Sequence, residues 1–144
     1  MRPNGNFFEE FAKWLDVCLA EPLPAGVRAF SFSLIERDLC FRVELTGTGE
    51  FDEFGSAWTW AEIWEPAVGP LTIPSAVCNG SREQAWKVVD GAVRAYLGVG
   101  RRGGKLRSRE AVALDTVEAG ATIIWQSTTK RAGAVSGETE TERM

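Results

Sequence analysis

Residues 29–46, AFSFSLIERDLCFRVELT, decide the fold class of this chain. Phenylalanine and leucine alternate with serine in the first half, and phenylalanine, valine and leucine alternate with Arg42 and Glu44 in the second. A period of two is typical of strands with one buried face, and the charged residues between the two runs are typical of a turn. We therefore predict an antiparallel hairpin with strands over 29–36 and 40–46.

An amphipathic helix is predicted on each side of this hairpin in the sequence. The first covers 6–19, with Asn6 as N-cap and Glu9 as the return partner of a capping box. The second opens at Ser81, has Gln84 at the matching position, and is expected to end at Gly98. Both have broad apolar faces, formed by Phe7, Phe8, Phe11, Trp14, Leu15, Cys18 and Leu19 in the first and by Trp86, Val89, Val93, Tyr96 and Leu97 in the second.

Four further strands complete the predicted sheet: 58–64, a short edge strand over 71–73, and a last hairpin over 110–117 and 121–127. Strands that do not alternate regularly with helices favour an α+β fold. We expect a mainly antiparallel sheet of about five to six strands, with the two amphipathic helices packed on one face and the other face available to a partner. Residues 1–127 are expected to form this single domain, and the polar residues 128–144 a disordered tail.

The composition excludes several kinds of site. The 144 residues include no histidine, which excludes Ser-His-Asp and Cys-His catalysis and any histidine-ligated metal. Three cysteines without close spacing, Cys18, Cys40 and Cys78, predict reduced thiols rather than a disulfide framework or metal site. No cofactor is expected. The chain shows no signal-peptide pattern and no apolar run of membrane-spanning length, so we expect a cytoplasmic protein that does not bind membranes.

The net charge of −4 is unevenly distributed. Residues 1–80 carry 12 acidic and 5 basic side chains, whereas residues 81–144 carry 8 acidic and 11 basic ones. The acidic part includes a 16-residue stretch, 50–65, with five carboxylates and three tryptophans but no basic residue. These are Glu50, Asp52, Glu53, Glu62 and Glu65, with Trp58, Trp60 and Trp64.

Three interpretations of this acidic stretch remain open. If 58–64 is a strand, Trp58, Trp60, Glu62 and Trp64 share one face, which is either an exposed binding surface or a core side. Acidic and aromatic side chains together suit a protein interface, since charge steers a basic partner and aromatic rings anchor it. Paired carboxylates also suit general acid–base chemistry, so a small carboxylate-dependent hydrolase is an alternative. The third interpretation is a solvated loop beside core tryptophans.

The basic part includes five cations within 101–109, and residues 98–103, GVGRRG, match the glycine motif G-x-G-x-x-G. A dinucleotide-binding glycine motif lies between a strand and a helix, whereas these glycines follow a predicted helix and precede a strand. The loop also lacks the aromatic residues used for base stacking. Five cations could bind phosphate or nucleic acid, or pair with the acidic 50–65 region within the chain or between subunits. We expect no nucleic-acid partner and favour a mobile, solvated connection.

The chain resembles small bacterial immunity proteins encoded beside polymorphic or contact-dependent toxins. The resemblance spans about residues 7–126 and rests on patterned hydrophobic residues and turns. They are Phe11, Trp14-Leu15, 23–27, 29–36, 44–48, Phe51-Asp52, Trp86, Tyr96-Leu97 and the final hairpin.

The resemblance implies a non-enzymatic immunity protein, or antitoxin, that neutralises its cognate toxin by forming a stoichiometric complex. The expected partner-binding residues are those of the acidic stretch: Glu50, Asp52, Glu53, Trp58, Trp60, Glu62 and Trp64. A homo-oligomeric interaction module that pairs through a sheet face or edge is a further alternative.

Overall fold

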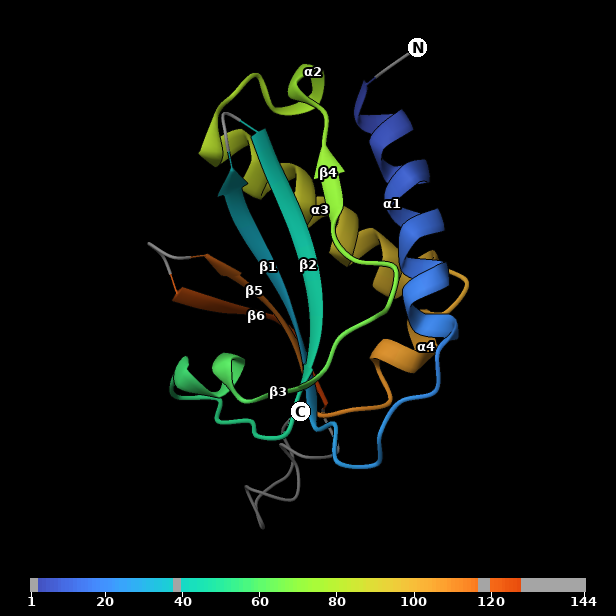
Figure 1. The fold of residues 1–144 in the computed structure, drawn as a ribbon, viewed down its shortest axis with the longest axis vertical. Helices are drawn as coiled ribbons and strands as arrows, with labels where there is room; N and C mark the ends of the chain where they lie inside the picture. Colours follow the sequence, from blue (N-terminus) through green and yellow to red (C-terminus); the bar gives the residue numbers. More distant parts are fainter. Residues whose placement is uncertain (1–2, 38–39, 117–119, 128–144) are drawn as a thin grey trace, which may run out of the picture.

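The computed structural model describes residues 3–37, 40–116 and 120–127. The fold is α+β, as predicted, with one six-stranded sheet and two long helices (Figure 1). The tail predicted for 128–144 lies outside the described residues. The elements follow in the order α1 Pro3–Ala20, β1 Ala29–Arg37, β2 Cys40–Thr48, η1 Ala57–Trp60, β3 Glu62–Trp64, β4 Leu71–Ile73, α2 Ser75–Cys78, α3 Arg82–Val99, α4 Gly103–Leu106, β5 Ala111–Thr116 and β6 Gly120–Gln126.

The predicted hairpins are confirmed, and they meet at the centre of the sheet. β1 pairs antiparallel with β2 over its whole length, and β5 pairs antiparallel with β6. The strand order is β3-β2-β1-β5-β6, with the short β4 also on β2. β1 and β5 run parallel, so the sheet is mixed although mostly antiparallel. The chain between these two strands includes α3, as a parallel crossover requires.

The main core lies between the sheet and the two long helices. Alternation along β1 and β2 directs Phe30, Phe32 and Leu34, together with Phe41, Val43 and Leu45, into this core. α1 contributes the buried face predicted from its sequence, and α3 contributes a matching one around Tyr96. The Tyr96 hydroxyl donates to Asp16 Oδ1 at 2.5 Å, which joins the two helices by a polar contact. Burial raises the pKa of Tyr96 above its ordinary value, and the hydrogen bond to Asp16 is the second largest cause of this increase.

The opposite face of the sheet is small and partly covered. Its central residues Ala29, Ser31, Ala111 and Ala113 are fully buried. Ala29, Ala111 and Ala113 form a second core cluster with Trp58, from the connection between β2 and β3. At this end of the sheet, the face that we expected to be available to a partner is therefore covered by Trp58.

Several predicted boundaries are also wrong. Residues 57–60 form a 3₁₀ turn and only 62–64 form a strand, so the strand predicted over 58–64 is confirmed only for its last three residues. α1 begins at Pro3, which places Asn6 inside the helix instead of at its cap. α3 begins as predicted, with the Ser81 hydroxyl accepting from the Gln84 N–H at 3.1 Å, but it continues through Gly98 to Val99. The following Gly100 packs its backbone against the Tyr96 ring, where a side chain would collide.

All three cysteines are free thiols in the structure. Cys18 and Cys78 are buried and Cys40 is partly exposed. Within the described ranges, none of the helices has the length and apolar character needed to cross a bilayer.

Candidate functional site

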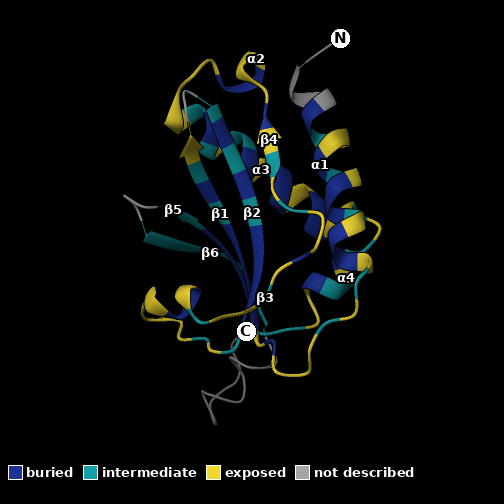
Figure 2. Cartoon of the chain, in the orientation of Figure 1, coloured by how far each residue is buried: buried dark blue, intermediate teal, exposed yellow. Residues whose placement is uncertain are grey.

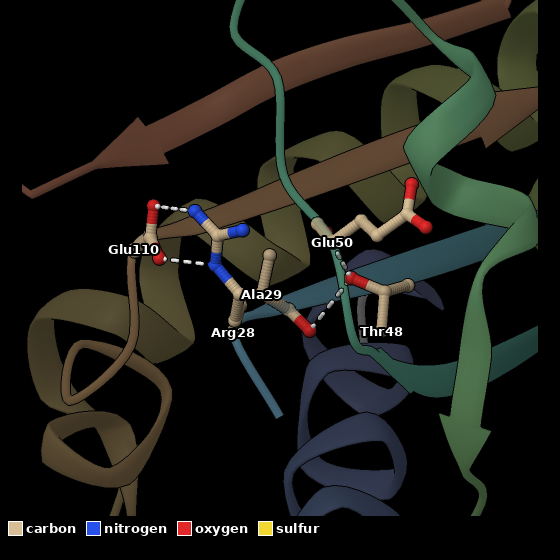
Figure 3. A network of polar contacts seen from close by, with 5 residues as sticks. All are labelled: Arg28, Ala29, Thr48, Glu50 and Glu110. Carbon is tan, nitrogen blue, oxygen red and sulfur yellow. Dashed lines mark hydrogen bonds and ion pairs between the residues drawn. The ribbon is translucent and has the colours of Figure 1, made fainter. Parts of the chain in front are cut away.

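The acidic stretch forms an ordered segment that leaves the sheet after β2 and returns at β3. Its base is closed by the Gly49 N–H, which donates to the Ala61 carbonyl oxygen at 2.9 Å. The Thr48 hydroxyl lies 2.9 Å from the Glu50 carbonyl oxygen and 3.4 Å from that of Ala29 (Figure 3). These contacts fix both ends of the segment to the sheet, and we call residues 50–65 the acidic segment.

An ion pair borders this base on the side of β5. Arg28 donates from Nε to Glu110 Oε2 at 2.6 Å and from a terminal nitrogen to Oε1 at 3.1 Å (Figure 3). This bidentate contact raises the pKa of Arg28, and the nearby charge of Glu50 contributes in the same direction. Within the described chain, the Glu50 carboxylate has no ion pair of its own, so it remains available to a cation from outside.

Trp58 anchors the acidic segment to the sheet. Its side chain is 3% exposed and packs in the cluster of Ala29, Ala111 and Ala113. The Phe51 ring meets it edge to face, with 5.0 Å between the ring centroids. The small residues of the sheet leave room for the large indole, and burial of its rings fixes η1. Trp58 is thus a core residue, and the predicted common face of Trp58, Trp60, Glu62 and Trp64 is wrong.

Trp60 has the opposite environment, two residues further along the chain. It is 85% exposed, because a 3₁₀ turn rotates successive side chains by about a third of a turn instead of alternating them between two faces. Phe54 is 89% exposed and Ile63 49% exposed in the same segment. Figure 2 shows the connection between β2 and β3 as mostly exposed. Three large apolar side chains therefore face solvent on one ordered segment.

The turn that presents Phe54 is held by Asp52. The Phe54 N–H donates to Asp52 Oδ1 at 3.0 Å, and the Gly55 N–H donates to the Asp52 carbonyl oxygen at 3.3 Å. This side-chain-to-backbone turn is a conformation that aspartate favours. Asp52 therefore has a structural role besides its charge. The sequence does not mark Phe54 as exposed, since a lone apolar residue in a loop has no periodicity that reveals its exposure. Ile63 falls within the predicted strand 58–64, and a strand pattern alone does not show which of its faces meets solvent.

The other carboxylates of the segment differ in their surroundings. Glu53 accepts a hydrogen bond from the Gln126 side-chain amide on β6. Glu62 is exposed, yet its pKa is raised, first by desolvation and then by the charge of Glu65 beside it. Trp64 is half-buried against Phe30, with 6.4 Å between ring centroids. Trp64 therefore contributes to the core as well as to the surface.

The described residues include no group of three or more acidic or cysteine side chains that could hold a metal ion. A hydrolytic carboxylate with a raised pKa belongs in an enclosed pocket, whereas Glu62 lies on the surface. The geometry of the acidic segment therefore suits binding better than acid–base chemistry.

In comparisons with known proteins, no protein-family model, no curated protein and no solved structure matches the chain. The function of the acidic segment is accordingly inferred from its own residues.

Proposed function

We propose that this protein binds and neutralises a cognate bacterial toxin as an immunity protein, through a stoichiometric complex and without catalysis. In this proposal it acts in the cytoplasm of the producing cell, and the acidic segment forms the interface. The sequence resemblance suggests the class of partner. The observation that carries the choice of surface is the exposure of Trp60 and Phe54 on an ordered, acidic segment.

Exposed aromatic residues suit this role for a physical reason. A tryptophan that is already ordered loses little conformational freedom on binding, and aromatic residues dominate the binding energy of protein interfaces. Here the Asp52 turn and the buried Trp58 fix the backbone on both sides of Phe54. Trp60 lies between Trp58 and Ala61, whose carbonyl oxygen accepts the Gly49 N–H. The segment is thus preorganised, which lowers the entropic cost of association.

The surrounding carboxylates suit a basic partner. The segment carries five acidic residues, and none of them forms an ion pair with another described residue. The electrostatic field of these unpaired carboxylates accelerates the association of the protein with a positively charged partner. Toxins that act on nucleic acids need basic surfaces, so this chemistry fits their inhibition.

A growth assay tests the proposal. The protein is co-expressed with the toxin domain encoded by the neighbouring gene, and growth and co-purification are measured. We expect wild type to restore growth and to form a 1:1 complex, and Phe54→Ala with Trp60→Ala to abolish protection. Val99→Ala, which truncates another exposed apolar residue outside the segment, is the matched control and should protect fully. No complex and no protection with wild type would refute the proposal.

A homo-oligomeric module is the second candidate, favoured by one feature of the sheet. β6 lies at the end of the strand order, and its seven residues are uncharged and half-buried. Uncharged edge strands of this kind pair readily with another chain. Light scattering distinguishes the two candidates, since a monomer at tens of micromolar refutes the oligomeric one.

A further inference from the structure

The basic stretch 101–109 surrounds the one-turn helix α4, which lies at the C-terminal end of α1 (Figure 1). Lys105 Nζ donates to the carbonyl oxygens of Leu19 and Glu21 at 2.6 and 2.7 Å. Arg107 Nε donates to the Leu97 carbonyl oxygen at 3.1 Å, and Leu106 is fully buried. These contacts tie the stretch to both long helices, so the predicted mobile connection is wrong.

Positive charge exceeds negative charge around Lys105. The Lys105 N–H donates to the Arg102 carbonyl oxygen at 3.0 Å, and the Ser108 hydroxyl links Lys105 to Arg109, since it donates to the Lys105 carbonyl oxygen at 2.5 Å and accepts from Arg109 at 3.1 Å. Desolvation lowers the pKa of Lys105, and the charges of Arg102 and Arg109 lower it further. The C-terminal end of α1 carries about half a negative charge because of the helix dipole. Glu21 is the one carboxylate whose charge acts on Lys105, and it already accepts the Ala67 N–H at 2.7 Å.

The two arginines are only partly compensated, although Asp16 lies near Arg102 through the Tyr96 hydroxyl, which accepts the Arg102 N–H at 3.1 Å and donates to Asp16 Oδ1. Within the described residues neither forms an ion pair with a carboxylate, and the Nε atom of each is buried without a hydrogen-bond partner. Arg109 donates from a terminal nitrogen to the Ser108 hydroxyl, which is neutral. Partly desolvated cations that lack a counter-charge attract anions more strongly than solvated ones do.

We propose that Arg102, Lys105 and Arg109 form a binding site for an oxyanion, the phosphate group of a small molecule. The negative charge of a phosphate group offsets the remaining positive charge, and its oxygens match the planar donor groups of two guanidiniums. The glycines of this stretch follow α3 instead of a strand, so side chains and not a nucleotide-binding glycine loop hold the anion. This site does not depend on the toxin-binding proposal and lies in a different part of the chain.

Inorganic phosphate is the probe that tests the site. Phosphate is titrated into the full chain by isothermal calorimetry at constant ionic strength set with chloride. We expect saturable binding to wild type, and at least about a tenfold loss of affinity in the double variant Arg102→Gln, Arg109→Gln. Arg101→Gln removes one exposed charge from the same stretch and should change the affinity less than about twofold.

Further measurements keep the test decisive. Far-UV circular dichroism confirms that each variant is folded, and Arg109→Gln alone, expected to weaken binding severalfold, replaces the double variant if that one unfolds. Absence of saturable binding to wild type, or an equal loss with Arg101→Gln, would overturn the site. So would steeply salt-dependent binding of a single-stranded oligonucleotide without phosphate binding, which would indicate a nucleic-acid surface instead.

Discussion

Two tryptophans separated by one residue are expected to respond to alanine substitution in opposite ways. Trp58 is 3% exposed against Ala29, Ala111 and Ala113, whereas Trp60 is 85% exposed. Truncating a buried aromatic residue to alanine costs about 3–5 kcal/mol of stability. The indole Nε1 of Trp58 is buried without a hydrogen-bond partner, so removing this unsatisfied group offsets about 1 kcal/mol of the lost stability. We therefore expect Trp58→Ala to lower the free energy of unfolding by about 2–4 kcal/mol.

Equilibrium unfolding in urea, followed by far-UV circular dichroism, measures this difference. With a slope of about 2 kcal/mol per molar urea, the Trp58→Ala midpoint should fall by about 1–2 M. Trp60→Ala changes an exposed side chain and should stay within about 0.5 kcal/mol of wild type. Equal midpoints for the two variants would show that Trp58 does not anchor the acidic segment to the sheet, and would refute the reasoning.

Three other predictions concern titration, thiol reactivity and association. Burial raises the pKa of Asp115 in the folded chain, so ionisation of this carboxyl opposes folding at neutral pH. Asp115→Asn should therefore be more stable than wild type at pH 7, and this gain should vanish as the pH falls below about 4, the pKa of aspartate in the unfolded chain. No gain in urea midpoint at pH 7 would contradict this prediction. Burial raises the pKa of Cys18 to about 12. At pH 8 the partly exposed Cys40 should therefore react with a thiol reagent long before Cys18 does. Equal labelling rates for the two cysteines would contradict the packing of α1. Charge reversal at the exposed Glu50 and Glu62 should slow association with the toxin domain and weaken its salt dependence in stopped-flow measurements, and an unchanged rate would place the interface elsewhere.

The sequence predicts the strands of the two hairpins well because their alternation has one physical cause. In β1 and β2, each apolar side chain at the second position enters the core, and the intervening residues face the other side. The parallel pairing of β1 with β5 has no such local signal. It joins residues about 80 positions apart, and it depends on how α3 returns the chain to the sheet.

The strand predicted over 58–64 fails at residues 58–60 because alternation of large aromatic residues does not by itself define a strand. The alanines of β1 and β5 leave space for one indole, and filling it with Trp58 favours a turn over an extended conformation. A tertiary contact therefore overrides the local propensity. The sequence shows directly that the acidic segment is charged, but which of its side chains are exposed depends on this packing.

The helix ends illustrate a second limit. Pro3 is well suited to a first helical turn, since its fixed backbone angle and missing N–H cost nothing there, and α1 begins at that residue instead of at Asn6. Gly98 is compatible with a helix end but does not require one. α3 ends where the Gly100 N–H donates to the Tyr96 carbonyl oxygen at 2.8 Å and its backbone lies against the Tyr96 ring.

The affinity of wild type and Trp60→Ala for the toxin domain of the neighbouring gene tests the central claim most directly. Calorimetry should give a 1:1 complex for wild type. Loss of an aromatic anchor costs about 2–4 kcal/mol of binding, so the Trp60→Ala dissociation constant should rise about 30- to 1,000-fold while its urea midpoint stays unchanged. Equal affinities for the two proteins, or no complex with wild type, would contradict the assignment of the acidic segment as the toxin-binding surface.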